Sequence, residues 1–270
     1  MFGKLGYNVY RAVENNMDAV SGLVENISNA NSVGYKKSQT SFAQTLNGEV
    51  AKYENKDFSQ GSLRRTGEAL DVAVEGTGFF EVELPTGQRA YTRAGRFGLN
   101  NEGELVTEEG YRVVPEVEQE EIPTLGSSKT EKDEPGLNIK VTTPKLTISP
   151  DLTPEIQEDG TVNGINPNTG EKTKIGKINV VVFNNPQGLE SLGKSYYFST
   201  KASGGPIDAD IGPNTSTKVK QGFLEFGNVD IATEFVHLSQ IKNLLTAQIK
   251  LLKAIDKIYE NVHYTISRSA

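Results

Sequence analysis

The sequence contains no cysteine and no tryptophan, and it has only two histidines among 270 residues. Without cysteine there is no disulfide, no thiolate nucleophile, no Cys-ligated zinc and no iron–sulfur cluster. The two histidines, His237 and His263, are too few for a His-rich metal site. We therefore expect no metal site and no cysteine chemistry.

Long apolar runs and an excess of positive charge are also absent. No stretch approaches the run of about 18 apolar residues that spans a bilayer. The first residues lack the basic start, apolar run and cleavage site of a secretory signal. Acidic residues (35) outnumber basic ones (28), which gives a formal net charge of −7. Because nucleic-acid and anionic-membrane binders need clustered Lys and Arg, we expect neither a nucleic-acid partner nor membrane insertion.

The sequence offers no convincing catalytic motif. Its one notable glycine-rich loop, Gly76-Thr77-Gly78, precedes an alternating strand pattern and not a helix, which favours a turn over a phosphate cradle. Both histidines lie in a segment with helical periodicity, and neither of them is near Ser195 in the sequence. We therefore predict no catalytic residue, no cofactor and no enzyme.

Residues from about 5 to 30 have a helical periodicity. Apolar residues recur there at intervals of three and four, at Val13, Met17, Val20, Val24 and Ile27. This spacing predicts a helix with one narrow apolar face. The Asn- and Ser-rich residues that follow, with Gly34 able to adopt a positive φ, predict where the helix ends.

Residues from 229 to about 266 predict a second long helix. Its apolar residues follow a heptad spacing with Gln248 at one skipped position, at Leu245, Leu252, Ile255, Tyr259 and Val262. A 4–3 repeat of this length is typical of a coiled coil. The chain thus begins and ends with heptad-like helices, which gain most by packing on each other and on neighbouring copies. The alternative, that both helices pack only on the middle of the chain, stays open.

The middle of the chain changes to a period of two. Short alternating runs separated by Gly, Pro and Asn turns predict an antiparallel β-rich domain. The predicted fold is therefore α+β, with terminal helices paired as a coiled-coil-like assembly domain around a central β-rich domain. We assign residues 1–41 to the first helix and its following segment, 42–58 to a linker, 59–220 to the β-rich domain and 221–270 to the last helix. Within the β-rich domain, residues 116–136 are strongly acidic and predict a solvated loop or insertion.

Three segments, in order along the chain, resemble a known family. The first is Asn26–Lys37, the second extends from Ser59 to Phe80 and continues to Thr107, and the third is Gln221–Asp230. These segments are similar to the signature sequences of the bacterial flagellar rod and hook proteins, the axial components of the basal body. Ser32 stands where the family's signature commonly has Thr.

The resemblance implies a structural subunit that self-assembles helically into a hollow shaft, transmits torque and conducts exported subunits. It implies a terminal-helix inner tube with the β-rich domain outside, location in the basal body, and type III export without a cleaved signal. The expected partners are other copies, other rod and hook proteins, the surrounding ring proteins and the export apparatus. Chain length fits the distal rod type or the larger proximal type, and the segments Leu70–Phe80 and Gln221–Val229 favour the distal type. The residues that we expect at the assembly interface are Val13, Met17, Val20, Val24, Ile27, Tyr35, Phe42, Asn228, Val229, Leu245, Leu252, Ile255, Tyr259 and Val262.

Three alternative functions remain open. One is a hook-type axial subunit, and another is a soluble binding module that uses the β-rich domain outside any filament. The third is a carbohydrate-active enzyme with Asp71, Glu75 or Glu81 as candidate carboxylates. That enzyme would need two carboxyl groups about 5 to 9 Å apart in a cleft.

Overall fold

The computed structural model describes residues 2–44, 50–116 and 145–269, and the side chains of residues 6–41, 54–116 and 145–261. The chain folds as two compact units. The first combines Met1–Ser62 with Phe226–Ala270, and the second is Leu63–Glu225. The first unit contains the two long helices and the second is built from antiparallel strands. This confirms the α+β class.

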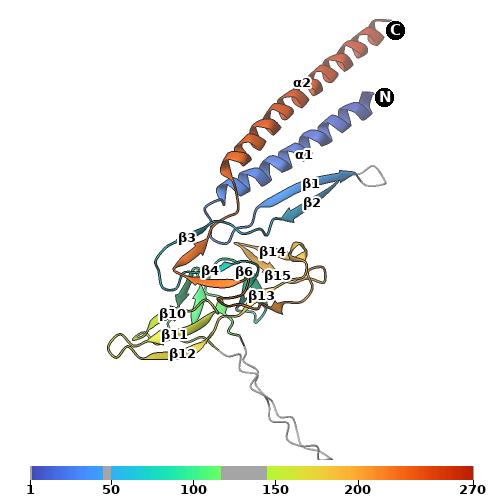
Figure 1. The fold of residues 1–270 in the computed structure, drawn as a ribbon. Helices are drawn as coiled ribbons and strands as arrows, with labels where there is room; N and C mark the ends of the chain where they lie inside the picture. The colour runs from blue at the N-terminus through green and yellow to red at the C-terminus, as the bar shows by residue number, and fades with distance from the viewer. Residues whose placement is uncertain (1, 45–49, 117–144, 270) are drawn as a thin grey trace, which may run out of the picture. The chain divides into compact units, whose positions relative to one another are not determined.

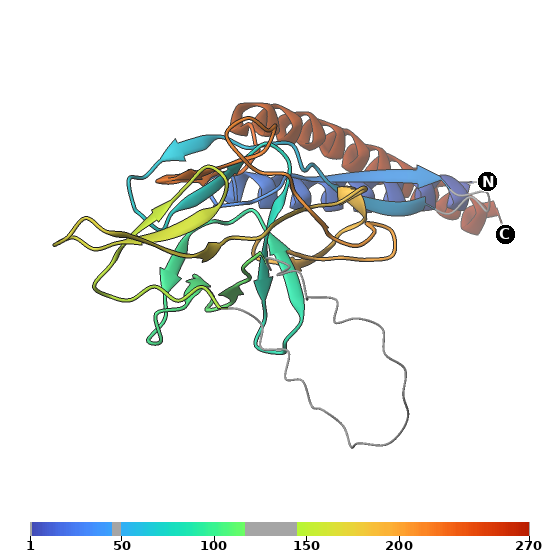
Figure 2. The same ribbon diagram turned by 60° about the horizontal axis from the view of Figure 1, so that its bottom comes forward.

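The two terminal helices lie side by side and antiparallel in the first unit (Figures 1 and 2). Helix α1 is Phe2–Ser28 and helix α2 is Ile231–Ser269. Asp230 caps α2, because its carboxylate accepts hydrogen bonds from the Thr233 hydroxyl (2.6 Å) and the Ala232 amide (3.1 Å). These bonds, the Thr233 hydroxyl first, hold the pKa of Asp230 below its usual value.

The segment between α1 and the second unit is a β-hairpin. Strand β1 (Ser38–Gln44) pairs antiparallel with strand β2 (Val50–Lys56), and β1 lies along α1 (Figure 1). The prediction of a linker over residues 42–58 was therefore wrong. The first residues of β1 are all polar, so the hairpin has little of the apolar alternation from which a strand is predicted.

Two glycines shape the junction at the base of the helices. Gly34 has a φ of 68°, which confirms the positive φ expected after α1. Gly61 passes so close to Phe226 that a Cβ atom would lie 1.9 Å from the Phe226 carbonyl oxygen. Val33 and Phe226 form an antiparallel bridge, so the segments that leave α1 and enter α2 are joined by backbone pairing.

The second unit is built from antiparallel strand pairs. In its described residues the largest sheet has nine strands, with the path β14-β15-β6-β5-β9-β8-β7; β13 also pairs with β5, and β16 pairs with β13. Smaller sheets are β10-β11-β12, β17-β4 and β18-β3. The strands are β3 (Leu63–Arg65), β4 (Val72–Glu75), β5 (Phe79–Glu83), β6 (Arg89–Thr92), β7 (Phe97–Leu99), β8 (Leu105–Thr107), β9 (Arg112–Val113), β10 (Thr153–Ile156), β11 (Thr161–Ile165), β12 (Lys172–Lys177), β13 (Val180–Val182), β14 (Glu190–Gly193), β15 (Tyr196–Phe198), β16 (Ile207–Asp208), β17 (Lys218–Gln221) and β18 (Phe223–Glu225), with a 3-10 turn at Pro186–Gly188.

The core of the second unit is apolar and collects side chains from several of these sheets. Phe80 and Phe97 stack edge to face, 5.1 Å between ring centroids, among Val, Leu and Ile side chains. Burying such side chains contributes about 1.5–3 kcal/mol each. The acidic stretch 116–136, expected to form a solvated loop, lies almost wholly outside the described residues.

Candidate assembly site

One face of α2 packs against α1. Gln248, the polar residue in the predicted heptad, accepts a hydrogen bond from the Asn16 side chain of α1 (3.0 Å). Residues three and four positions from Gln248 share its face. Ile255 is only 5% exposed there, and Leu245 and Leu252 are half-buried. The heptad spacing of α2 therefore marks the side that faces α1.

Helix α1 buries only part of its predicted apolar stripe within one chain. Val9, which extends the stripe, is 9% exposed, while Met17 and Val24 are 60% and 49% exposed. Two asparagines also point inward: Asn16 bonds to α2, and Asn26 (1% exposed) bonds to the start of β1. A count of apolar residues does not detect such hydrogen bonds.

Asn26 joins the end of α1 to the start of β1. Its Oδ1 accepts hydrogen bonds from the Ser38 amide (2.9 Å) and the Tyr35 hydroxyl (3.0 Å). Its Nδ2 donates to the Ser38 carbonyl (2.8 Å). The side chain thus pairs with Ser38 much as a neighbouring strand would. This amide therefore links the end of α1 to the start of β1.

We expect Asn26→Ala to destabilise the first unit by about 2–3 kcal/mol, because it leaves the Ser38 amide and carbonyl buried without partners. Thermal unfolding of the full chain, followed by far-UV circular dichroism, measures the loss. Hydrogen exchange at the Ser38 amide should accelerate as well. The control is Asn8→Ala on the exposed side of the same helix, which should change stability by less than about 0.7 kcal/mol. Equal stabilities for the two variants would contradict the role of Asn26.

A buried ion pair lies next to Asn26. The Lys37 ammonium group contacts the Glu234 carboxylate, and Glu234 is fully buried. The Lys37 amide donates to Asn228 Oδ1 (2.7 Å), while Asn228 Nδ2 donates to the carbonyl of Asp57 (2.8 Å). Lys37 therefore ties the start of β1 to α2 and to the segment before it. Burying either charge without the other costs free energy, so this ion pair favours the one arrangement of the junction in which the two charges meet.

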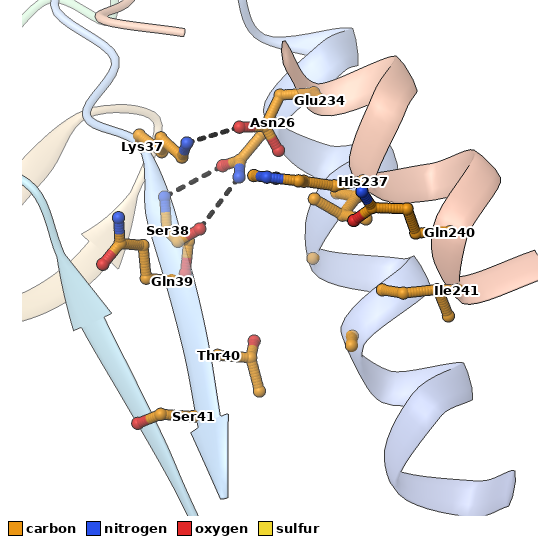
Figure 3. A pocket seen from close by; sticks show the side chains of 13 residues that line it. Asn26, Lys37, Ser38, Gln39, Thr40, Ser41, Glu234, His237, Gln240 and Ile241 are labelled. Atoms are coloured by element: carbon orange, nitrogen blue, oxygen red, sulfur yellow. Dashed lines mark hydrogen bonds and ion pairs between the residues drawn. The ribbon is translucent and has the colours of Figure 1, made fainter. Parts of the chain in front are cut away.

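The junction borders a groove of about 420 Å³ between α1, β1 and the first turns of α2 (Figure 3). Figure 3 shows Lys37 reaching from the start of β1 toward Glu234, beside Asn26. Most of the residues that line it have polar side chains, and Ala19, Leu23 and Ile241 are apolar.

The residues expected at the assembly interface differ in how exposed their side chains are within one chain. Val13, Val20, Ile27, Val229, Leu245 and Leu252 are half-buried, Ile255 is buried and Tyr259 is 43% exposed. Tyr35 and Asn228 form the junction bonds described above. Phe42 and Val262 lie in β1 and α2, but their side chains fall outside the described ones. A role for any of these residues between copies stays a prediction.

Sequence reasoning missed four residues that organise the first unit. Asn26 and Lys37 appear only as the ends of the signature segment, and Asn16 and Glu234 were not singled out. A signal was available for one of them, since Glu234 lies seven residues before Ile241 and fourteen before Gln248. A charged residue in phase with a heptad seam points to a partner in the seam.

The carboxylates considered for an enzyme are held in structural contacts. Glu75 pairs with Lys220 (2.8 Å) and Glu81 accepts a hydrogen bond from Asn179 (2.7 Å). Asp71 is largely buried. Over the described residues, no group of three acidic or His side chains is placed to hold a metal ion. In the same residues, neither helix has the length and apolar character needed to cross a membrane.

Comparison with known proteins gives consistent similarities. Residues 73–164 match the model of the flagellar hook protein FlgE/F/G D1 domain. The chain is 34% identical over 207 residues to the flagellar basal-body rod protein FlgG of Buchnera aphidicola subsp. Schizaphis graminum, covering 77% of this chain and 69% of that protein. A second Buchnera FlgG, from subsp. Acyrthosiphon pisum, is 32% identical over 76% of this chain and 68% of its own length. The FlgG of Bacillus subtilis is 28% identical over 95% of this chain and 96% of its own length.

Proposed function

The chain belongs to the family of flagellar basal-body rod proteins, and we propose that it is a structural, axial subunit of the rod, of the distal type. Its place is the flagellar basal body. The observation that carries this function is the extent of the similarity, which reaches both terminal helices as well as the β-rich unit. A binding module that uses only the β-rich unit would not require similarity in the helices.

In this function the protein acts by packing and not by catalysis. Copies contact one another through the helical unit, and a heterologous contact whose rotation does not close generates a helical filament. Other rod and hook proteins continue the shaft at its two ends. The finer picture, which we also propose, is a hollow shaft that transmits torque, conducts exported subunits and contacts the surrounding rings. The chain itself reaches that place by type III export.

Complementation tests this function. A flagellated bacterium that lacks its own distal rod protein should regain rods and swimming when it expresses this chain. Isolated basal bodies examined by electron microscopy should contain a rod with the protein along it. Expression and export without any rod would contradict the function. A hook whose length changes, with the rod still missing, would favour the hook-type alternative.

A further inference from the structure

Four lysines of α2 lie on one side of the helix. They are Lys242, Lys250, Lys253 and Lys257, and all four side chains are exposed. Since each residue turns an α-helix by about 100°, the four positions lie within a sector of about 80°. From the first to the last, the row is about 22 Å long, at about 1.5 Å per residue. We call this row the lysine face of α2.

The lysine face points away from α1. Gln248 bonds to Asn16 of α1, and Ile255 is 5% exposed on the same side of α2. Lys250 follows Gln248 by two positions, and Lys257 stands in the same relation to Ile255. Two positions correspond to about 200° around a helix, so these lysines lie opposite the packed side. Changes to their side chains should therefore leave the pairing of α1 with α2 intact.

The charges of the lysine face are not neutralised within the described part of the chain. Over those residues, none of its four lysines forms an ion pair. Asp256 is the one acidic residue between Lys242 and Lys257, so the lysines outnumber the carboxylates of this stretch. A row of like charges buried without opposing carboxylates is costly. We therefore expect the lysine face to stay in contact with water.

The sequence of this chain has the charge that complements the lysine face. The whole chain has a formal net charge of −7. Between residues 116 and 136 the sequence has seven acidic residues and only two lysines. In an unfolded copy of the chain these carboxylates are free to meet another charged surface. An acidic, extended polypeptide is therefore the kind of partner that the lysine face fits.

We propose that the lysine face of α2 binds acidic, unfolded polypeptides as they pass through the shaft, and that unfolded copies of this chain are among them. This inference rests on the proposed function, in which the shaft is hollow and conducts exported subunits. Each copy in the shaft adds one lysine face. Each contact is weak, because physiological salt screens exposed charges beyond about 8 Å. Many weak contacts attract an acidic chain without holding it at one place, as conduction requires.

Peptide binding to the purified full chain tests the lysine face directly. The probe is a fluorescently labelled peptide with the sequence of residues 116–136, and fluorescence anisotropy measures its dissociation constant at low ionic strength. K250E/K257E should bind it at least about tenfold more weakly than the wild type, and K250R/K257R should bind it normally. The control K194E/K201E makes the same change in net charge at exposed residues of the second unit and should keep most of the affinity. No binding by the wild type, or equal binding by K250E/K257E, would contradict the inference.

Export through assembled rods gives a second test. In a flagellated bacterium that lacks its own distal rod protein, K250E/K257E should still form rods, which electron microscopy counts. The passenger is an exported hook subunit tagged with residues 116–136, and a matched passenger has Gln at each acidic position of the tag. Through K250E/K257E rods the acidic passenger should reach the medium at least about threefold more slowly than the matched one. Wild-type rods should show no such deficit, as immunoblotting of the medium measures.

The outcomes separate this inference from the proposed function. Rods that form with K250R/K257R but not with K250E/K257E would place the lysines in contacts between copies, and the inference would be wrong while the function stands. The inference is also wrong if K250E/K257E rods export both passengers equally. If the wild-type chain restores no rods, the proposed function itself is wrong, whatever the peptide binding shows.

Discussion

The Leu252→Asp chain should form no assemblies and should not support swimming. Leu252 is half-buried on the face of α2 that bonds to α1, between Gln248 and the buried Ile255. An aspartate there places a carboxylate on the face of α2 that packs against α1. Such an unpaired buried charge costs about 3–5 kcal/mol, a large part of the stability of a small helical unit.

Two measurements check this prediction. Thermal unfolding followed by far-UV circular dichroism should give a lower midpoint for the helical signal, and sedimentation should detect only the monomer. The matched control is Leu99→Asp, which introduces the same charge at an exposed leucine of strand β7 (38% exposed). Filaments and motility from the Leu252→Asp chain would mean that the seam between α1 and α2 is assigned to the wrong residues.

Both helices were predictable from the sequence because their apolar periodicity extends over many turns. A prediction from a repeat of that length does not depend on any single residue. The observed ends of α1 and α2 therefore lie within a few residues of the predicted ends. The inward side chains of two asparagines of α1 were not predictable in this way. Asn16 and Asn26 take inward positions because their amides bond to Gln248 and Ser38, and those partners are distant in the sequence.

The hairpin of β1 and β2 illustrates a second limit. A strand is recognised from the sequence when one of its faces is buried in an apolar core. The first residues of β1 are polar, and Ser38 bonds through its backbone to a side chain of α1. Backbone hydrogen bonds do not require particular side chains, so they cannot be predicted from the residue types. Residues 42–58 were interpreted as a linker for this reason.

Ion pairs between residues that are far apart in the sequence are a third kind of feature that cannot be predicted from the sequence. Arg93 follows strand β6 and Glu225 ends strand β18, 132 residues later in the chain. Nothing near either residue in the sequence indicates that they meet. Their contact depends on the order of strands in the second unit, so it becomes visible only once the sheets are known.

Arg93 and Glu225 form a fully buried pair in that unit. Their side chains are 3% and 1% exposed, and Arg93 Nη1 lies 3.2 Å from Glu225 Oε2. Arg93 Nη2 also donates to the Gly76 carbonyl (2.9 Å), and the guanidinium group lies over the Phe79 ring, 5.2 Å from its centroid. Burial lowers the pKa of Arg93, while the Glu225 carboxylate opposes that shift. One guanidinium group therefore joins β18 to the connection between β4 and β5.

We expect Arg93→Met to destabilise the second unit by about 3–5 kcal/mol, because it leaves the Glu225 carboxylate buried without a cation. Unfolding followed by the near-UV circular dichroism of tyrosine measures the loss in the full chain, which has no tryptophan. The double variant R93M/E225M should recover most of it, because an apolar pair removes both charges at similar volume. If the double variant is as unstable as the single one, the loss comes from packing around Arg93 and not from the stranded charge.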